Sequence, residues 1–237
     1  MLSYDPPGAL KGQDSTPATT LASNVKAAAV AAAKNASLTS ATANNGVPTM
    51  NQKQTNTHIW LVTGPAGCGK STVAEHLAEA LGMPYIEGDS FHTTANVEKM
   101  RNGIPLTDAD RWDWLTALRE ESMRQISEGS AGVILTCSAL KRKYRDVIRV
   151  AAYYDHHLLI HFIYLDAPEE VLLQRVMSRQ GHYMGANMVH SQFDILERPS
   201  ESEKDVTTID VSRSINDVLQ DALDRVIQAM SSDDSNQ

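Results

Sequence analysis

The strongest constraint on the fold of this chain is one short segment, Gly64-Pro65-Ala66-Gly67-Cys68-Gly69-Lys70-Ser71. It fits the pattern G-x-x-x-x-G-K-[ST], follows a hydrophobic stretch and precedes an amphipathic one, which is the strand-loop-helix context that this motif requires. The glycines let the backbone curl so that several N–H groups converge on phosphate oxygens, and the helix adds the positive end of its dipole. The segment therefore predicts a nucleotide-binding α/β fold.

The polar side chains of this phosphate loop predict its ligands. We expect Lys70 to reach the β- and γ-phosphates of ATP and Ser71 to ligate the Mg²⁺ that bridges them. Cys68 is interpreted as a small space-filling residue and not as a redox switch. Contacts to ATP are expected along the loop and into the helix, from Gly64, Pro65, Ala66, Gly67, Cys68, Gly69, Lys70, Ser71 and Thr72.

Apolar runs alternate with helical patterns from His58 onward, which is typical of a parallel sheet with crossover helices. The predicted strands are His58–Thr63, Pro84–Glu87, Gly132–Cys137, Leu159–Leu165 and Val206–Val211. The predicted helices are Lys70–Leu81, Thr94–Arg101, Trp112–Ser127, Lys141–Ala152, Pro168–Arg179, Asn187–Leu196 and Ile215–Met230. The expected architecture is an α/β P-loop kinase fold, a five-stranded parallel sheet with helices on both faces and a mobile lid.

Residues 1–57 differ in composition from the rest of the chain. They hold twelve alanines and only six charged residues, and a segment of this composition cannot bury a hydrophobic core. We predict a disordered tail over 1–57, a kinase domain over 58–231 and a disordered end over 232–237. A mitochondrial transit peptide is the alternative for the tail, but no arginine precedes Arg101 and the tail contains Asp5 and Asp14. Translation from Met50 would remove the tail and leave the domain intact.

Composition excludes several classes of function. The 29 acidic residues outnumber the 21 basic ones and give a net charge of −8, so no broad basic surface for nucleic acid is expected. No apolar run approaches the length of a membrane span. Cys68 and Cys137 alone cannot make a disulfide scaffold or a four-ligand zinc site, which favours a reducing, cytoplasmic location. The spacing of His156, His157 and His161 suggests no chemistry.

Motifs outside the phosphate loop favour a small-molecule kinase. The base-reading motifs of GTPases do not follow Ser71, and a large motor or AAA-type ATPase needs a longer core than the roughly 180 residues available. Asp89 follows the second strand, at the sheet edge where ligands bind, and is predicted to orient or deprotonate the acceptor hydroxyl. The alternative is that Asp89 caps the helix after Phe91.

Two arginines suit a lid over the transferring phosphoryl group. Arg175 and Arg179 lie four residues apart on one helix face, and the glycine-flanked segment from Gln180 to Gly185 follows them. Without a phosphate loop such a pair would be a solvated helix face. With one, both are predicted to be catalytic.

Longer patterns resemble those of the gluconokinases from about Ile59 to Val226, which is the folded domain without the tail. They are Glu87-Gly88-Asp89-x-x-His92-x-x-x-Asn96-x-x-Lys99-Met100-x-x-Gly103-x-Pro105-Leu106-x-Asp108-x-Asp110-Arg111-x-x-Trp114-Leu115, Cys137-Ser138-Ala139-Leu140-Lys141-x-x-Tyr144-Arg145-Asp146, the arginine pair with Gly181-His182-Tyr183, and Gln192-Phe193. The resemblance implies a fold similar to shikimate and adenylate kinases, ATP with Mg²⁺, and phosphorylation of D-gluconate at its 6-hydroxyl, which feeds the pentose phosphate pathway. Family members are often homodimers. Glu87 departs from the Asp that is common in the family.

An acidic sugar needs cations and hydrogen-bonding groups in the acceptor pocket. The candidate cations are Lys99, Arg111, Lys141 and Arg145, with Arg111 the first choice; its alternative is an ion pair with Asp108 or Asp110. His92 and Asn96, one helical turn apart, are predicted to contact the polyol, although His92 fits a surface residue equally well. Trp112 and Trp114 are interpreted as packing residues.

Other functions fit less well. An adenylylsulfate kinase also carries a glycine-Asp element after its second strand, but the patterns from His92 to Trp114 and from Ser138 to Lys141 argue against it. Adenylate and shikimate kinases lack support because their lid-proximal and triple-glycine motifs are absent. From a different class, a non-catalytic nucleotide-binding protein is disfavoured because Lys70, Ser71 and Asp89 are all present.

Overall fold

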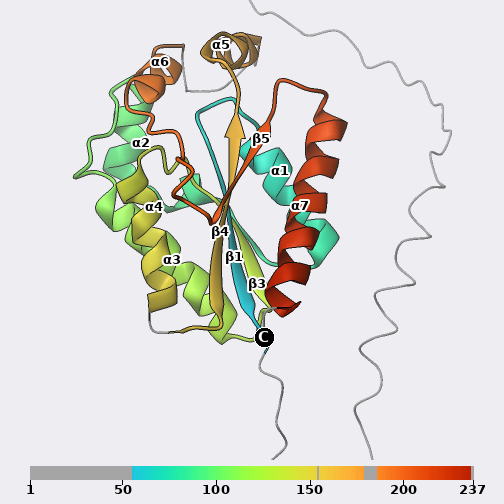
Figure 1. Cartoon of the computed structure of the whole chain (residues 1–237). Coiled ribbons are helices and arrows are strands. Elements are labelled where there is room, and N and C mark those ends of the chain that lie inside the picture. Colours follow the sequence, from blue (N-terminus) through green and yellow to red (C-terminus); the bar gives the residue numbers. More distant parts are fainter. Residues whose placement is uncertain (1–54, 154, 179–185, 236–237) are drawn as a thin grey trace, which may run out of the picture. The chain divides into compact units, whose positions relative to one another are not determined.

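The computed structural model describes residues 55–153, 155–178 and 186–235 (Figure 1). Five strands form one parallel sheet in the order β2-β3-β1-β4-β5, which confirms the predicted architecture. The strands are β1 (Thr57–Thr63), β2 (Tyr85–Ile86), β3 (Gly132–Thr136), β4 (Leu158–Asp166) and β5 (Val206–Asp210). Residues 1–54 of the tail predicted over 1–57, and Arg179 with the predicted lid segment 180–185, lie outside the described residues. The predicted tail is one residue too long at its end, because β1 begins at Thr57.

Helices connect the strands as predicted, with differences at their ends. They are α1 (Lys70–Leu81), α2 (Thr94–Arg101), α3 (Trp112–Ser127), α4 (Arg142–Arg149), α5 (Glu169–Ser178), α6 (Ala186–Asp194) and α7 (Ile215–Ser235), with short 3₁₀ helices η1 (Gly88–Phe91) and η2 (Val150–Tyr153). The first three match the predicted bounds. The predicted disordered end at 232–237 is wrong for residues 232–235, because α7 continues past Met230 to Ser235.

Alternation along β1 divides the core into two layers. Trp60 and Val62 pack with the apolar faces of α1 and α7, whereas Ile59 and Leu61 pack with those of α3 and α4. Figure 1 shows the same arrangement, with α1 and α7 on one side of the sheet and α3 and α4 on the other. Burial on both faces explains why β1 is apolar along its length.

The carboxyl edge of the sheet carries the predicted site. β1 ends at Thr63 and runs into the phosphate loop, β2 leads into η1, and β3 ends at Thr136 beside both. Beyond this edge lie α2, α5 and α6 (Figure 1), and a small cluster of Met100, Leu106 and Met188 joins α2 to α6. The strand order therefore brings segments that are far apart in sequence to one place.

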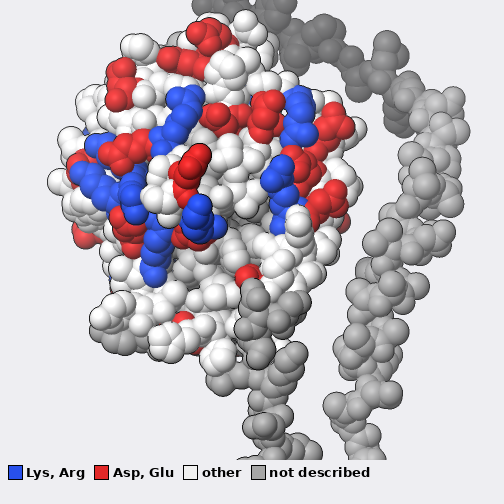
Figure 2. All heavy atoms as spheres, in the orientation of Figure 1, with Lys and Arg blue, Asp and Glu red and all other residues white. Residues whose placement is uncertain are grey.

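Charged side chains of both signs are interspersed on the face seen in Figure 2. Many are paired; Arg149, for example, binds Asp146, Glu203 and Asp205. Among the helices that the structure describes, none is both long and apolar enough to cross a membrane.

Candidate active site

The phosphate loop follows β1 and has a backbone that only glycine adopts readily. Gly67 has φ +83°, and a Cβ there would lie 2.8 Å from Val176 Cγ2 and 3.2 Å from the Leu172 carbonyl oxygen. Gly69 precedes α1 in the left-handed region, with φ +98°. Both glycines are therefore required, one by its close approach to α5 and the other by its turn into the helix.

Hydrogen bonds within the loop and from α6 fix its shape. The Ala66 N–H donates to Gln192 Oε1 on α6 at 2.7 Å, and the Gln192 side chain is buried. Lys70 Nζ donates to the carbonyl oxygens of Gly64 and Pro65, at 3.0 and 3.1 Å. Cys68 is buried, and burial raises the pKa of its thiol, which supports its interpretation as a packing residue.

Glu87 accepts hydrogen bonds from three hydroxyl groups at the loop. Its carboxylate accepts from Ser71 Oγ at 2.8 Å, from Thr136 Oγ1 at 2.6 Å and from the Tyr85 hydroxyl. Burial opposes ionisation, but the hydrogen bonds from Thr136, Tyr85 and Ser71 hold the pKa of this carboxyl below its ordinary value. Glu87 is thus an ionised residue of the site.

Sequence reasoning missed this role. It treated Glu87 only as a departure from a family pattern and did not single out Thr136. The available signal was that both residues end neighbouring parallel strands, whose carboxyl ends meet at one edge.

Asp89 lies on η1, immediately after Glu87 and Gly88. A Cβ on Gly88 would lie 1.9 Å from the Thr136 carbonyl oxygen, so only glycine permits this path beside β3. The cap of α2 is Thr93, whose hydroxyl accepts from the Asn96 N–H, and Asp89 is free of the capping role considered for it. Half of the Asp89 side chain is exposed. Burial of the rest and the nearby Glu87 charge nonetheless raise the pKa of its carboxyl, against the opposing effect of Lys70.

A cavity of about 40 Å³, which we call the acceptor cavity, lies beside Asp89 and the phosphate loop. Its polar lining comes from Lys70, Asp89, His92, Arg111, Ser138 and Gln192, and its apolar lining from Ala66, Met100, Leu106 and Met188. The structure therefore unites the predicted base, the loop lysine and two of the predicted substrate-binding residues.

His92 is buried in this cavity wall and is no surface residue. Its ring stacks on Trp114 at 4.0 Å between centroids, and Trp114 donates to the Gly88 carbonyl oxygen at 2.7 Å. Burial, aided by the charge of Arg111, lowers the pKa of His92 to about 4, so the ring is neutral at pH 7. Its Nδ1 is buried and has no hydrogen-bond partner among the described residues.

Arg111 reaches the acceptor cavity without a carboxylate partner in the described part of the chain. The two alternatives for it are both occupied: Asp108 binds Lys141, Lys143 and Tyr144, and Asp110 binds Lys99 and Thr107. Arg111 Nε is buried without a hydrogen-bond partner there, and the guanidinium lies 5.4 Å from the centre of the Tyr144 ring. A buried cation in this state is suited to an anionic ligand.

Three further predicted contacts lie beside the acceptor cavity and do not line it. Asn96 is buried and donates to the Asp110 carbonyl oxygen at 2.7 Å. Lys99 pairs with Asp110 at 2.6 Å, and Lys141 with Asp108 at 3.0 Å. All three hold the segment that presents Arg111.

The surroundings of Arg145 contradict the substrate-binding role predicted for it. Its guanidinium is fully buried and forms two hydrogen bonds to Glu203, at 2.7 and 2.8 Å, and two to the carbonyl oxygens of Ala139 and Glu197. It does not line the acceptor cavity. The prediction that Arg145 binds substrate is wrong, because four of its five N–H donors and its charge are already paired within the fold.

A second cavity, of about 290 Å³, lies on the other side of the phosphate loop. It is lined by Gly67, Cys68, Gly69, Thr72, Val73, Arg175, Val211, Arg213, Ile215 and Val218. Arg175 donates to the Val211 carbonyl oxygen at 2.6 Å and so lies on this side of the loop, away from the acceptor cavity. Arg179, its predicted partner, is outside the described residues, and Arg213 was not singled out from the sequence.

Comparisons with known proteins agree with this geometry. A family model described as an AAA domain matches residues 59–201. From chain length alone, AAA-type ATPases were excluded because they need a longer core. The matched AAA domain, however, lies entirely within the folded domain, so chain length does not exclude this family. A probable gluconokinase of Schizosaccharomyces pombe is 47% identical over 171 residues, which cover 71% of this chain and 88% of that protein.

Solved structures give the same result. A gluconokinase from Sinorhizobium meliloti aligns with a TM-score of 0.64 and 37% identity, covering 76% of this chain and 97% of that one. An APS kinase from Mycobacterium tuberculosis aligns with a TM-score of 0.53 at 18% identity, which shows a shared fold alone.

Proposed function

The chain belongs to the gluconokinase family and matches the AAA domain model over residues 59–201, and from this membership we propose how its residues transfer the γ-phosphoryl group of ATP to the 6-hydroxyl of D-gluconate. The observation that carries the proposal is the acceptor cavity, where Asp89, His92 and Arg111 face Lys70 across one small space. It combines a base, a hydrogen-bonding group and a cation, which is the set that a hydroxylated carboxylate requires.

ATP binds along the phosphate loop, from Gly64 to Thr72. The two cavities on opposite sides of the loop support a division of the nucleotide, with the nucleoside in the larger cavity beside Arg175 and Arg213 and the γ-phosphate directed toward Asp89. Lys70 is the cation for the phosphates. The predicted catalytic roles of Arg175 and Arg179 remain predictions, and the position of Arg175 favours contact with ATP over contact with gluconate.

The oxygen atoms around Ser71 fit a magnesium ion. The Ser71 hydroxyl and the Glu87 carboxylate lie 2.8 Å apart beside the loop, and hard oxygen donors with room for water are what Mg²⁺ prefers. Ser71 would ligate the ion directly, and Glu87 would hold its water ligands or replace one. The ion would offset phosphate charge during transfer.

Asp89 orients the 6-hydroxyl of gluconate and takes its proton. The raised pKa of this carboxyl brings its basicity closer to that required of a general base near neutral pH. His92 Nδ1 accepts from or donates to a sugar hydroxyl, and Arg111 binds the carboxylate. Met100, Leu106 and Met188 form the apolar wall against which the carbon chain of gluconate would pack.

A substrate panel tests the proposal. ADP release is measured with gluconate, glucose, shikimate, AMP and adenylylsulfate at the same ATP and Mg²⁺ concentrations. Gluconate should exceed glucose by far, because glucose leaves the Arg111 charge buried and unpaired. Faster turnover of shikimate, AMP or adenylylsulfate would exclude gluconate as the substrate and leave phosphoryl transfer standing, whereas no turnover of any acceptor would favour a non-catalytic nucleotide-binding protein.

The organisation of the whole chain completes the proposal. We expect the kinase activity to reside in the domain that begins near residue 58, with residues 1–57 dispensable. Cytoplasmic location, favoured by the cysteine content, and a homodimer, implied by the family resemblance, stay predictions.

A further inference from the structure

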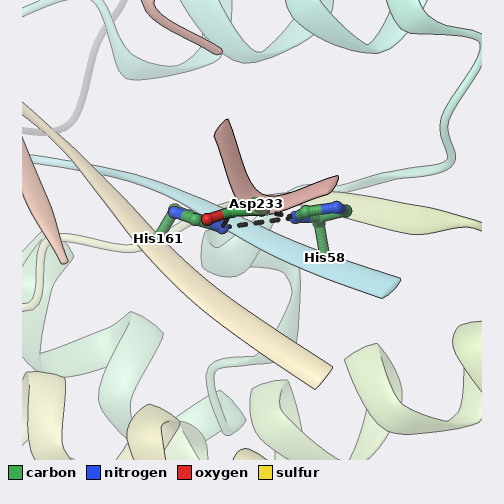
Figure 3. A group of neighbouring side chains, drawn as sticks. All are labelled: His58, His161 and Asp233. Carbon is green, nitrogen blue, oxygen red and sulfur yellow. Dashed lines mark hydrogen bonds and ion pairs between the residues drawn. The ribbon is translucent and has the colours of Figure 1, made fainter. Parts of the chain in front are cut away.

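A group of three ligating side chains lies at the amino edge of the sheet, opposite the active site. His58 is near the start of β1, His161 is within β4 and Asp233 is near the end of α7 (Figure 3). The phosphate loop begins six residues after His58, a distance of roughly 20 Å along an extended strand. This cluster is therefore separate from the phosphate and acceptor sites.

The strand register explains why the two histidines meet although 103 residues separate them. His161 is the partner of Trp60 in the β1-β4 pairing, and His58 precedes Trp60 by two residues, so all three project from the same face. That face is covered by α7, which brings Asp233 over the rings (Figure 3). Trp60 stacks on His161 at 4.0 Å between ring centroids.

Their ligating atoms converge. His58 Nδ1 lies 3.2 Å from His161 Nε2, and Asp233 Oδ2 lies 3.3 Å from His161 Nε2 and 3.9 Å from His58 Nδ1. Tetrahedral zinc, with ligands at roughly 2.0 to 2.2 Å, places neighbouring ligand atoms about 3.3 to 3.6 Å apart. One of the three separations falls in that range, one is 0.1 Å shorter and the third is 0.3 Å longer, so an ion would need only small movements of the side chains.

The Asp233 carboxylate gives a second, independent indication. Its Oδ2 atom is buried and accepts no hydrogen bond from the residues that the structure describes. A proton shared between the two imidazoles occupies their facing nitrogens and leaves this oxygen unsatisfied, which is costly for a buried oxygen atom even though a quarter of the side chain is exposed. A cation at the centre of the three atoms would satisfy the oxygen and both nitrogens together.

We propose that His58, His161 and Asp233 form a site for one divalent transition-metal ion, with zinc the best match. Two imidazoles and a carboxylate suit zinc better than magnesium, and three protein ligands leave a fourth position for water. Because its ligands come from β1, β4 and α7, the ion would fasten the last helix to the sheet. This stabilising site is independent of the phosphotransferase activity.

Thermal unfolding of the chelator-treated full chain tests the site. Zinc chloride at a hundredfold excess over its dissociation constant should raise Tm by roughly 5 to 10 °C, and equilibrium dialysis should give one zinc ion per chain. Magnesium chloride should not raise Tm in the same way. Absence of stoichiometric zinc binding would leave only a hydrogen-bonded cluster and overturn the proposal.

Matched variants locate the ion. His161→Gln and Asp233→Asn should each lose the zinc-dependent rise in Tm, whereas His156→Gln, at an exposed histidine just before β4, should keep it. Asp233→Asn also guards against misfolding, because it changes one atom near the end of a helix. A zinc response that persists in both His161→Gln and Asp233→Asn would overturn the assignment.

Trp60 supplies a spectroscopic readout. Its ring stacks on His161, so paramagnetic Co²⁺ bound at this site should quench its fluorescence, and Trp60→Phe should remove most of the quenching. Gluconate phosphorylation by Asp233→Asn, assayed with excess Mg²⁺, should equal that of the unaltered chain. Failure of the metal site and failure of the proposed kinase function are thereby distinguished.

Discussion

Arg111, just before α3, and Arg145, on α4, are both buried arginines, yet their surroundings differ. Arg145 directs four of its five N–H donors at Glu203 and two carbonyl oxygens, and it does not line the acceptor cavity. Arg111 has no carboxylate partner in the described structure and has a buried Nε without an acceptor. The structural cation, Arg145, is thus hydrogen-bonded within the fold, whereas the cation that faces the cavity, Arg111, has hydrogen-bonding capacity left for a ligand.

The difference shows how to separate the two roles without a bound ligand. Buried polar atoms are nearly always hydrogen-bonded, so the exceptions indicate where a ligand completes the set. At the acceptor cavity, Arg111 Nε and His92 Nδ1 are both such exceptions, and they lie close to Asp89 and Lys70. Mutations in the two regions should therefore act on different quantities, stability around Arg145 and catalysis or binding around the cavity.

The largest effect is expected for Arg145→Ala. Removing the guanidinium leaves Glu203 buried with only Arg149 as its cation, and the free energy of unfolding should fall by about 3 to 5 kcal/mol. Denaturant unfolding measures this loss. The paired variant Arg145→Met with Glu203→Leu should recover much of it, because neither charge then remains uncompensated. A stable Arg145→Ala protein with a raised KM for gluconate would contradict the structural role.

Lys70→Ala should act almost entirely on catalysis. Among the residues that the structure describes, the ammonium donates hydrogen bonds only to loop carbonyl oxygens, so its loss should leave Tm nearly unchanged. The kcat should fall on the order of 10²- to 10³-fold, as for other positioned charges that stabilise a transition state. Steady-state assays with gluconate beside thermal unfolding make the test. An unchanged kcat would refute the role of the phosphate loop in transfer.

Arg111→Ala should raise the KM for gluconate by roughly 10- to 100-fold, the loss of a charge-assisted contact worth about 1.5 to 3 kcal/mol. The KM for ATP should change little, and stability should hold, because the arginine has no ion pair in the described structure to lose. Lys99→Ala is the matched control: its ammonium pairs with Asp110 outside the cavity, and its effect on KM should be smaller. If Lys99→Ala raised the KM for gluconate more than Arg111→Ala does, Lys99 and not Arg111 would be the residue that binds the carboxylate.

Local sequence was enough to predict the fold and the residues that meet at the acceptor cavity, whose catalytic roles remain predictions. The phosphate loop, Asp89 and the alternation of strands and helices are short-range patterns, and each requires a specific backbone that the structure contains. Helix ends next to glycine or a capping residue were also predicted well, as at Gly82 and Thr93. The end of α7 was not, because its final turn is polar and its ordering depends on contacts with the sheet.

Long-range pairing is what the sequence could not supply. Nothing near Arg145 in the chain identifies Glu203 as its partner, and nothing near Arg111 shows that Asp108 and Asp110 are taken by Lys141 and Lys99. The same limit hid the contact between His58 and His161, which depends on the register of β1 with β4. Residue type and spacing identify candidates, but the strand order decides which of them have unused hydrogen-bonding capacity.

The smallest effect expected is the pH dependence contributed by His92. Burial lowers its pKa to about 4 in the folded protein, against an ordinary value near 6.5, so the unfolded chain binds the proton more readily. The contribution of neutral His92 to the free energy of unfolding should therefore be present above pH 6.5 and should be lost as pH drops toward 4. Between pH 7.5 and 5.5 this group alone should cost about 1 kcal/mol. His92→Phe keeps a ring to stack on Trp114 and removes the titration, so the difference between the two unfolding curves isolates His92 from every other titrating group. Parallel curves would mean that the ring is protonated or solvated in the folded state, and that it is not the neutral, unsatisfied group that distinguishes the acceptor cavity from the Arg145 cluster.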